Sequence, residues 1–131
     1  MTDVARRTID DLLAQARAEL GHRPTPAEAH AAAQAGEALL VDIRAGDVLA
    51  RDGSIPGAIH HQRTALEWRV DPDCEWRDDR VADLDAPLIL VCSQGYASSL
   101  AAQTLRDMGF TRVTDMDGGF DAWKEQGLPV D

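Results

Sequence analysis

The order of secondary structure is clearest in residues 88–108, which read LILVCSQGYASSLAAQTLRDM. Leu88–Val91 is a short, continuous apolar run after a proline, and such a run predicts a strand that is buried on both faces. From Ser98 to Met108 the apolar residues recur at helical spacing, which predicts a helix that Ser98 or Ser99 can cap. The stretch therefore predicts a strand, a short loop and a helix in direct succession.

A cysteine occupies the carboxyl end of this strand. Cys92 is followed by a loop of small and polar residues, and successive backbone N–H groups that point into such a loop form a nest for an anion. The following helix adds a partial positive charge at its N-terminus, and Gly95 allows the left-handed backbone that such a loop requires. These features favour the thiolate form of Cys92. The alternative is an inert thiol in the core, but the strand, loop and helix together favour a functional cysteine.

Two helices are expected before the first strand. Residues Arg6–Leu20 carry apolar side chains on one side, which is typical of an amphipathic helix that either packs on the domain or mediates self-association, as in a homodimer. Thr25–Glu28 read TPAE, with an N-cap threonine, a proline at the first helical position and a glutamate that completes a capping box. We therefore expect an N-terminal helix and linker over residues 1–24 and one domain over residues 25–131.

Strands and helices alternate along the rest of the chain. This order predicts an α/β fold, with right-handed crossovers and a parallel sheet that is covered by helices on both faces. Because ligands bind beyond the carboxyl ends of such strands, Cys92, Asp42–Arg44 and the segment after Ile59 are expected near one edge. The expected strands are Leu39–Ile43, a short one at Ile59–His60 and Thr111–Met116; the expected helices are Ala65–Val70 and Phe120–Gln126; loops are expected at Gly46–Asp47 and Arg51–Ser54.

The composition limits the partners and the compartment. The formal net charge is −10, which disfavours binding to nucleic acid or to an anionic membrane. Apolar runs are far shorter than a membrane span, and the first 20 residues have acidic side chains and no apolar core of a signal peptide. The two cysteines, Cys74 and Cys92, form no CxxC pair and have no need of a disulfide. A cytoplasmic location is therefore expected.

Four blocks of the chain, in this order, resemble the rhodanese domain. The resemblance covers roughly Thr25 to Val130 and implies a rhodanese-like fold, with a central parallel sheet of five strands, helices on both faces and no metal or organic cofactor. The blocks are Val41–Arg44, Gly53–His60, Cys92–Ser98, and Gly118–Trp123 followed by Gly127–Val130.

The resemblance also implies a sulfurtransferase with Cys92 as its nucleophile. This cysteine would take the outer sulfur of thiosulfate or of a persulfide, carry it as a persulfide and pass it to cyanide or a thiol. The same N–H cradle that favours a thiolate would bind the persulfide anion. The residues expected to bind substrate are those of the loop, Ser93, Gln94, Gly95, Tyr96, Ala97 and Ser98.

The loop departs from the family pattern in one respect. Many active rhodanese loops have arginine at the fifth position after the cysteine, where this chain has Ala97. A fixed positive charge is therefore absent from the loop, so a persulfide is expected to be a better donor than thiosulfate. Arg44, Arg63 or Arg69 could supply the cation instead, although Arg44 and Asp42 also suit a structural pair at the strand end.

The same residues also bear on functions other than sulfur transfer. A non-catalytic rhodanese-like module that binds a partner or senses redox state is the main alternative. Phosphatases and arsenate reductases with a related loop need an arginine six residues after the cysteine, and Ser98 stands there. His60 and His61 alternate in direction on a strand, which disfavours a shared metal site, and Cys74 is interpreted as a bystander.

Overall fold

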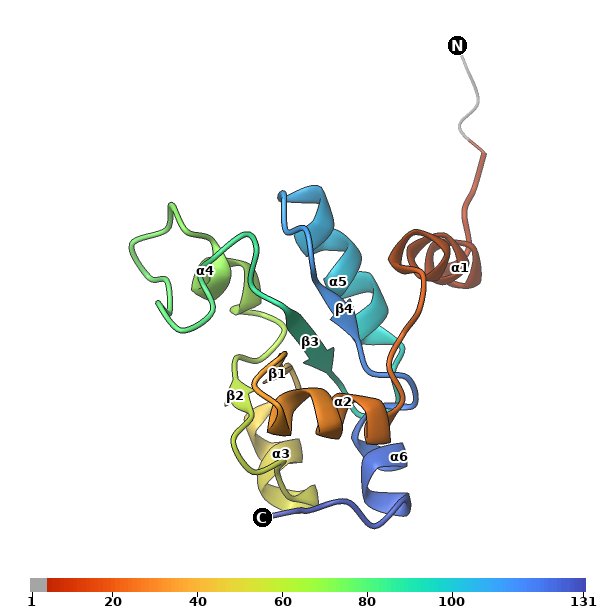
Figure 1. The fold of residues 1–131 in the computed structure, drawn as a ribbon. Helices are drawn as coiled ribbons and strands as arrows, with labels where there is room; N and C mark the ends of the chain where they lie inside the picture. The colour runs from red at the N-terminus through yellow and green to blue at the C-terminus, as the bar shows by residue number, and fades with distance from the viewer. Residues whose placement is uncertain (1–4) are drawn as a thin grey trace.

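The computed structural model describes residues 5–131; residues 1–4 of the expected N-terminal segment lie outside the described part. In that part, four parallel strands form one sheet in the order β2-β1-β3-β4 (Figure 1). The strands are β1 (Leu39–Asp42), β2 (Ile59–His60), β3 (Leu88–Val91) and β4 (Thr114–Asp115). The helices are α1 (Ile9–Leu20), α2 (Pro26–Gln34), α3 (Gly46–Asp52), α4 (Leu66–Val70), α5 (Ala97–Asp107) and α6 (Gly119–Glu125).

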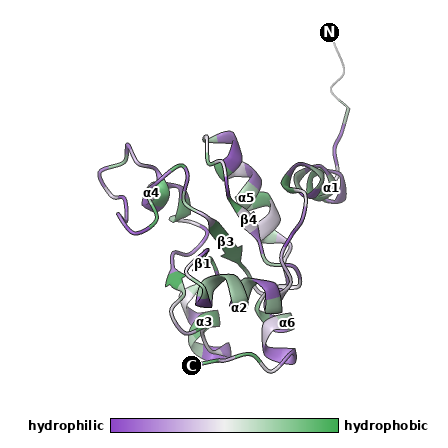
Figure 2. Ribbon diagram, viewed as in Figure 1, coloured by the Kyte–Doolittle hydropathy of each residue, from purple (hydrophilic) through white to green (hydrophobic). Residues whose placement is uncertain are grey.

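The central strand β3 is buried on both faces, as its apolar run predicts. Leu88 and Leu90 join one apolar cluster, and Ile89 and Val91 join the other, because successive side chains of a strand point to opposite faces. Helices α1, α4 and α5 contribute to the first cluster, and α2 and α6 to the second. Figure 1 shows these two groups of helices on the two sides of the sheet, and Figure 2 shows apolar residues along the strands between them. The predicted α/β class is confirmed.

Capping boxes begin the first two helices. The Thr25 hydroxyl accepts from the N–H of Glu28, and the Glu28 carboxylate accepts from the N–H of Thr25, as the sequence predicts for α2. Thr8 and Asp11 form the same pair at the start of α1. Each pair satisfies N–H groups that a helix start would otherwise leave without partners. None of the helices in residues 5–131 is both long and apolar enough to cross a membrane.

Helix α1 packs on the domain, and this was one of its two expected roles. Leu20 is buried in the same cluster as Leu105 of α5, and Ala16 is buried as well. Arg106, in the last turn of α5, donates to the carbonyl of Leu20 and so holds the end of α1. The end of α1 is thereby fixed against the last turns of α5.

The sheet has four strands in the described residues, one fewer than the resemblance implied. The segment Arg23–Pro24 runs beside β4, and the N–H of Asp117 donates to the carbonyl of Pro24 at 2.9 Å. Proline has no N–H of its own, so this segment cannot extend the contact into a ladder of strand hydrogen bonds. The chain therefore lies at the edge of the sheet without becoming a strand.

Two further expectations are wrong. Gly46–Asp52 forms helix α3 rather than a loop, because its glycine-rich ends bracket a helix-forming centre, Val48–Ala50. The last strand covers only Thr114–Asp115, instead of Thr111–Met116. The carbonyl of Val113 accepts from the side chain of Arg106, so it is not available to a neighbouring strand.

Shortening a buried side chain of the central strand β3 should lower the stability much more than shortening an exposed side chain of the neighbouring strand β1. Leu90 is 0% exposed, and Leu90→Ala should lower the free energy of unfolding by about 2–5 kcal/mol, since it leaves a cavity. Leu39, in the adjacent β1, is 36% exposed, and Leu39→Ala should cost less than about 1 kcal/mol. Urea unfolding of both variants measures the difference, and equal losses would contradict the assignment of the core.

Candidate active site

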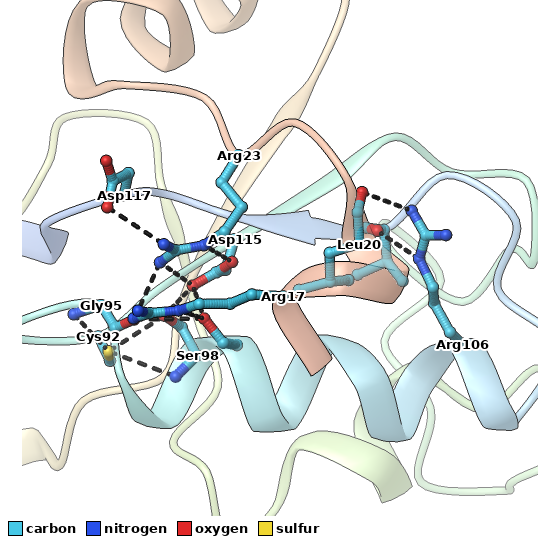
Figure 3. Close-up of polar contacts among 11 residues, drawn as sticks. Arg17, Leu20, Arg23, Cys92, Gly95, Ser98, Arg106, Asp115 and Asp117 are labelled. Atoms are coloured by element: carbon cyan, nitrogen blue, oxygen red, sulfur yellow. Dashed lines mark hydrogen bonds and ion pairs between the residues drawn. The ribbon is translucent and has the colours of Figure 1, made fainter. Parts of the chain in front are cut away.

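The sulfur of Cys92 lies in a cradle of polar groups from the loop after β3. The N–H of Gly95 lies 3.1 Å from Sγ, and the N–H of Ser98 lies 3.4 Å from it (Figure 3). The thiol of Cys92 donates to Oγ of Ser98 over 3.2 Å. Two backbone donors and a hydroxyl thus meet at one sulfur atom, which is the nest that the loop sequence predicts.

Cys92 is a buried member of the first apolar cluster and also lines a cavity. The residue is 7% exposed, and the cavity beside it has a volume of about 310 Å³. The loop residues Gly95 and Ser98 contact the sulfur, whereas the other loop residues named from the sequence line the cavity. The lining residues are Ile43, Arg44, Ala45, Val48, Arg63, Cys92, Ser93, Gln94, Tyr96 and Ala97.

The predicted serine cap of α5 is wrong. Tyr96 is the N-cap, and its side chain makes no capping hydrogen bond. The hydroxyl of Ser98 donates to Asp115 at 2.7 Å, and the hydroxyl of Ser99 donates to the same carboxylate at 2.8 Å. Asp115, in β4, is buried completely, and a buried carboxylate requires such donors. Both serines therefore serve the carboxylate behind the loop, and the first N–H groups of α5 remain available to the sulfur.

The carbonyl groups at the start of the loop are bound by the first turn of α6. The N–H of Phe120 donates to the carbonyl of Cys92 at 2.8 Å, and the N–H of Asp121 donates to that of Ser93 at 2.9 Å. This close approach requires glycine at position 119, where φ is +64° and an added Cβ would lie 2.6 Å from the Cys92 carbonyl oxygen. The glycine pair before α6 thus allows the helix to hold the loop.

Two of the three arginines considered from the sequence reach the cavity. Arg44 is buried and donates to Asp42 at 2.6 Å, which fits the structural pair expected at the strand end. Arg63 lines the cavity and pairs with Glu67 at 2.6 Å; its side chain is 39% exposed. Arg69 is not among the lining residues, because its guanidinium donates to the carbonyl of Trp76. The structure therefore does not bring Arg69 to the cavity.

Two arginines that the sequence analysis did not identify, Arg17 and Arg23, bind a backbone carbonyl of the loop. Arg23 donates to both carboxylate oxygens of Asp115, at 2.8 and 3.0 Å, and also to the carbonyl of Gly95. The hydrogen bonds that the Arg23 guanidinium donates to Asp115 raise the pKa of Arg23, and the charge of Cys92 acts in the same direction. Arg17, in α1, donates to the same Gly95 carbonyl at 2.8 Å. The one available signal was Asp115, a carboxylate next to apolar residues that needs a basic partner.

The remaining chemical side chains lie elsewhere. His60 bonds to the carbonyl of Arg44, and His61 pairs with Asp78 at 2.7 Å, so the two histidines have separate partners. Cys74 is a free thiol beside a second cavity, whose lining includes no residue of the Cys92 loop. These side chains take no part in the cradle.

The contact between α6 and the loop predicts a difference between two glycine substitutions. Gly119→Ala should slow alkylation of Cys92 by iodoacetamide at neutral pH, because its Cβ pushes the loop away from α6. Gly127 also has positive φ, at +73°, but no atom lies within 4 Å of an added Cβ. Gly127→Ala should therefore cost about 1–2 kcal/mol of stability through strain alone and leave the alkylation rate unchanged. The same rate in both variants would contradict the role of Gly119.

Comparisons with known proteins agree with the fold. The rhodanese-like domain family matches residues 25–126. Thiosulfate sulfurtransferase GlpE of Stutzerimonas stutzeri (strain A1501) is 40% identical over 102 residues, which are 78% of this chain and 84% of that protein. Human single-domain sulfurtransferase TSTD1 is 24% identical, covers 81% of this chain with 98% of its own, and has a TM-score of 0.68.

One solved structure is similar along the entire chain. RPA3614 of Rhodopseudomonas palustris CGA009 is a protein of unknown function, described as a possible tyrosine phosphatase. It covers 100% of this chain with 99% of its own, at 33% identity and a TM-score of 0.87. The family match, which spans most of the chain, and the parallel sheet with its cysteine loop lead to one assignment: the chain belongs to the rhodanese-like domain family.

Proposed function

We propose that this protein transfers sulfane sulfur through a persulfide on Cys92. The chain is a rhodanese-type sulfurtransferase, as are its relatives named thiosulfate sulfurtransferase GlpE, at 34–40% identity over 102 residues in three of them. The observation that supports the mechanism is the cradle itself: N–H groups of Gly95 and Ser98 on the sulfur of a cysteine that opens on a cavity. Donors aimed at a sulfur anion stabilise both the attacking thiolate and the persulfide.

The proposed reaction has two displacement steps. The thiolate of Cys92 attacks the outer sulfur of the donor, and the sulfur–sulfur bond of the donor breaks. The leaving group, sulfite from thiosulfate or a thiolate from a persulfide, departs with the electron pair. In the second step an acceptor thiolate or cyanide attacks the outer sulfur, and Cys92 departs as the thiolate. The enzyme thus returns to its starting state without an external oxidant or reductant.

The hydroxyl of Ser98 has a separate part in this proposal. It donates to Asp115 when Cys92 is a thiol, and it can turn to donate to the sulfur when Cys92 becomes an anion. Asp115 then still accepts from Ser99 and from Arg23. The carboxylate therefore loses one donor of several, and the sulfur anion gains one.

The other loop residues would shape the substrate pocket. Ser93, Gln94, Tyr96 and Ala97 line the cavity into which the outer sulfur of the persulfide would extend. Arg63 lines it as well, and its partly exposed side chain could turn from Glu67 to an anionic donor such as thiosulfate. Both a persulfide and thiosulfate are therefore proposed as donors, with a thiol or cyanide as acceptor.

Phosphatase chemistry is not proposed for this chain, although RPA3614 is described as a possible tyrosine phosphatase. An oxyanion loop of that kind needs a bidentate arginine six residues after the cysteine. Ser98 occupies the position, and its hydroxyl is bound to Asp115. Hydrolysis of p-nitrophenyl phosphate that depends on Cys92 would contradict this argument.

Sulfur loading tests the proposal directly. The protein is incubated with thiosulfate or with glutathione persulfide, and the peptide that contains Cys92 is analysed by mass spectrometry. We expect a gain of about 32 Da, one sulfur atom, that is removed by cyanide or by excess thiol. The amount loaded should be one sulfur per chain, because a single cysteine lies in the cradle.

Two variants serve as controls for sulfur loading. Cys92→Ser should abolish the mass gain, and Cys74→Ser should leave it unchanged, because Cys74 lies beside a different cavity. If neither donor loads the wild-type protein, or if the gain persists in Cys92→Ser, the non-catalytic rhodanese-like module becomes the better interpretation. The cytoplasmic location, the homodimer and the absence of nucleic-acid or membrane partners stay predictions from the sequence.

A further inference from the structure

Two arginines of the N-terminal segment converge on one carbonyl of the Cys92 loop. Arg17 and Arg23 donate to the carbonyl oxygen of Gly95 at 2.8 and 3.0 Å (Figure 3), and both precede residue 25, where the family match begins. We propose that both arginines are positioning residues, which hold the Cys92 loop in its anion-binding conformation. Arg23 also neutralises Asp115 behind the loop, and Arg17 supplies the positive charge that Ala97 does not. This inference rests on the proposed role of Cys92 as the nucleophile.

The bonds to the Gly95 carbonyl fix the direction of the Gly95–Tyr96 peptide, which lies between the two N–H groups that contact the sulfur. Gly95 has φ of +84°, and a glycine can leave such a conformation easily unless its neighbours restrain it. Because a trans peptide points its C=O and its N–H in opposite directions, a carbonyl held by the arginines turns the N–H of Tyr96 away from them. The same conformation places the N–H of Gly95 on the sulfur of Cys92. Without the arginines, the Gly95 carbonyl would keep only the Ser99 hydroxyl, at 3.3 Å, and this part of the loop would be less restrained.

Arg17 is held firmly enough to act in this way. Its Nε donates to the hydroxyl of Ser99 at 3.2 Å, and its guanidinium lies 5.5 Å from the centre of the Tyr96 ring. The helix that carries it, α1, is fixed to the domain through buried Leu20. Both groups that accept hydrogen bonds from Arg17, the Ser99 hydroxyl and the Gly95 carbonyl, are uncharged, so they leave its positive charge uncompensated.

Arg23 acts on the electrostatics of the sulfur through Asp115. The carboxylate of Asp115 lies 2.7 Å from Oγ of Ser98, which lies 3.2 Å from the sulfur of Cys92. A negative charge so close would oppose a thiolate or a persulfide anion. Arg23 donates a hydrogen bond to each oxygen of the carboxylate and neutralises its charge. Asp115 can therefore order the serines behind the loop without opposing the charge on Cys92.

The two arginines have different electrostatic parts: Arg23 is paired with the carboxylates of Asp115 and Asp117, and Arg17 supplies positive charge beside the loop from outside the pocket. The hydrogen bonds to Asp115 raise the pKa of Arg23, and the charges of Asp115, Asp117 and Cys92 act in the same direction. The guanidinium of Arg17 binds the carbonyl of Gly95, and the N–H of Gly95 contacts the sulfur. Arg17 therefore acts on the sulfur from behind the loop and does not contact the substrate. The cavity side of the loop at Ala97 thus remains free of a charged side chain.

The test compares two arginines that both hold α1 to the domain. Arg17→Met removes the bonds to the loop. Arg106→Met is the matched control: it removes one positive charge and the bonds to the carbonyls of Glu19 and Leu20, but Arg106 makes no contact with the loop. Both are made in a Cys74→Ser background, and the rate of Cys92 alkylation by iodoacetamide is measured against pH.

For Arg17→Met we expect the midpoint of the alkylation profile to move to higher pH by roughly half a unit to one unit. At neutral pH this means roughly three- to tenfold slower alkylation. Sulfur loading should slow by a similar factor, and Arg17→Lys should recover part of the shift, because it restores the charge but not the fork of donors. Arg106→Met should leave the midpoint unchanged, even where it lowers thermal stability as much as Arg17→Met.

The proposal is overturned if Arg17→Met keeps the wild-type profile or if Arg106→Met shifts it equally. Alkylation needs no sulfur transfer, so a wild-type protein that fails to load sulfur would contradict the proposed function without deciding the role of Arg17. Arg23→Met alone leaves buried Asp115 without its cation and can unfold the protein. The double variant Arg23→Met/Asp115→Asn removes both charges. If its alkylation midpoint equals that of Asp115→Asn, the charge of Arg23 does not affect the ionisation of Cys92, and the part of the proposal that concerns Arg23 is overturned.

Discussion

The structure of the site depends on one constraint: the carbonyl groups of the Cys92 loop must point away from the sulfur. A peptide group that turns its oxygen outward turns its N–H the opposite way. The N–H groups that share peptides with the bound carbonyls are those of Ser93, Gln94 and Tyr96, whereas the N–H groups on the sulfur are those of Gly95 and Ser98. Bonds to the loop carbonyls therefore restrain the backbone on either side of the donors that form the cradle. The carbonyls of Cys92 and Ser93 are held by N–H groups of α6, and that of Gly95 is held by Arg17 and Arg23. The loop has little apolar content of its own, so these external bonds take the place of a local core.

The bonds to the loop come from distant parts of the chain. Helix α6 follows β4 and can approach the loop because of the glycine pair Gly118–Gly119. Asp115 lies in β4, and the two arginines lie in the N-terminal segment. The parallel sheet brings β3 and β4 side by side, so that the loop after β3 and the turn before α6 meet at the carboxyl edge. The fold thus positions the site by bringing donors from α6 and from the N-terminal segment, and the acceptor Asp115 from β4, around one loop.

The sequence predicted those features that local patterns determine. The apolar run of β3, the N-terminal capping pattern of α2 and the cysteine after a buried strand are each encoded within a few residues, and each was found in its place. Arg17 and Arg23 could not be identified in this way, because an arginine on an amphipathic helix or in a linker has the same local pattern whether it faces solvent or a buried carbonyl. The serine cap of α5 failed for a related reason: Asp115, which is remote in sequence, binds both hydroxyl groups.

A buried carboxylate beside a reactive sulfur needs a reason, because Asp115 works against the anion that the loop is built to hold. Asp115 orders the groups behind the loop: it accepts hydrogen bonds from Ser98 and Ser99, and it holds Arg23, which in turn binds the Gly95 carbonyl. The repulsion between the Asp115 carboxylate and an anionic sulfur is offset only while Arg23 pairs with that carboxylate. Under the proposed roles of Arg17 and Arg23, the segment before residue 25 belongs to the functional unit of this chain, although the family match begins after it. A change that loosens this segment should weaken the cradle before it disturbs the sheet, because its polar bonds end on the loop and on β4.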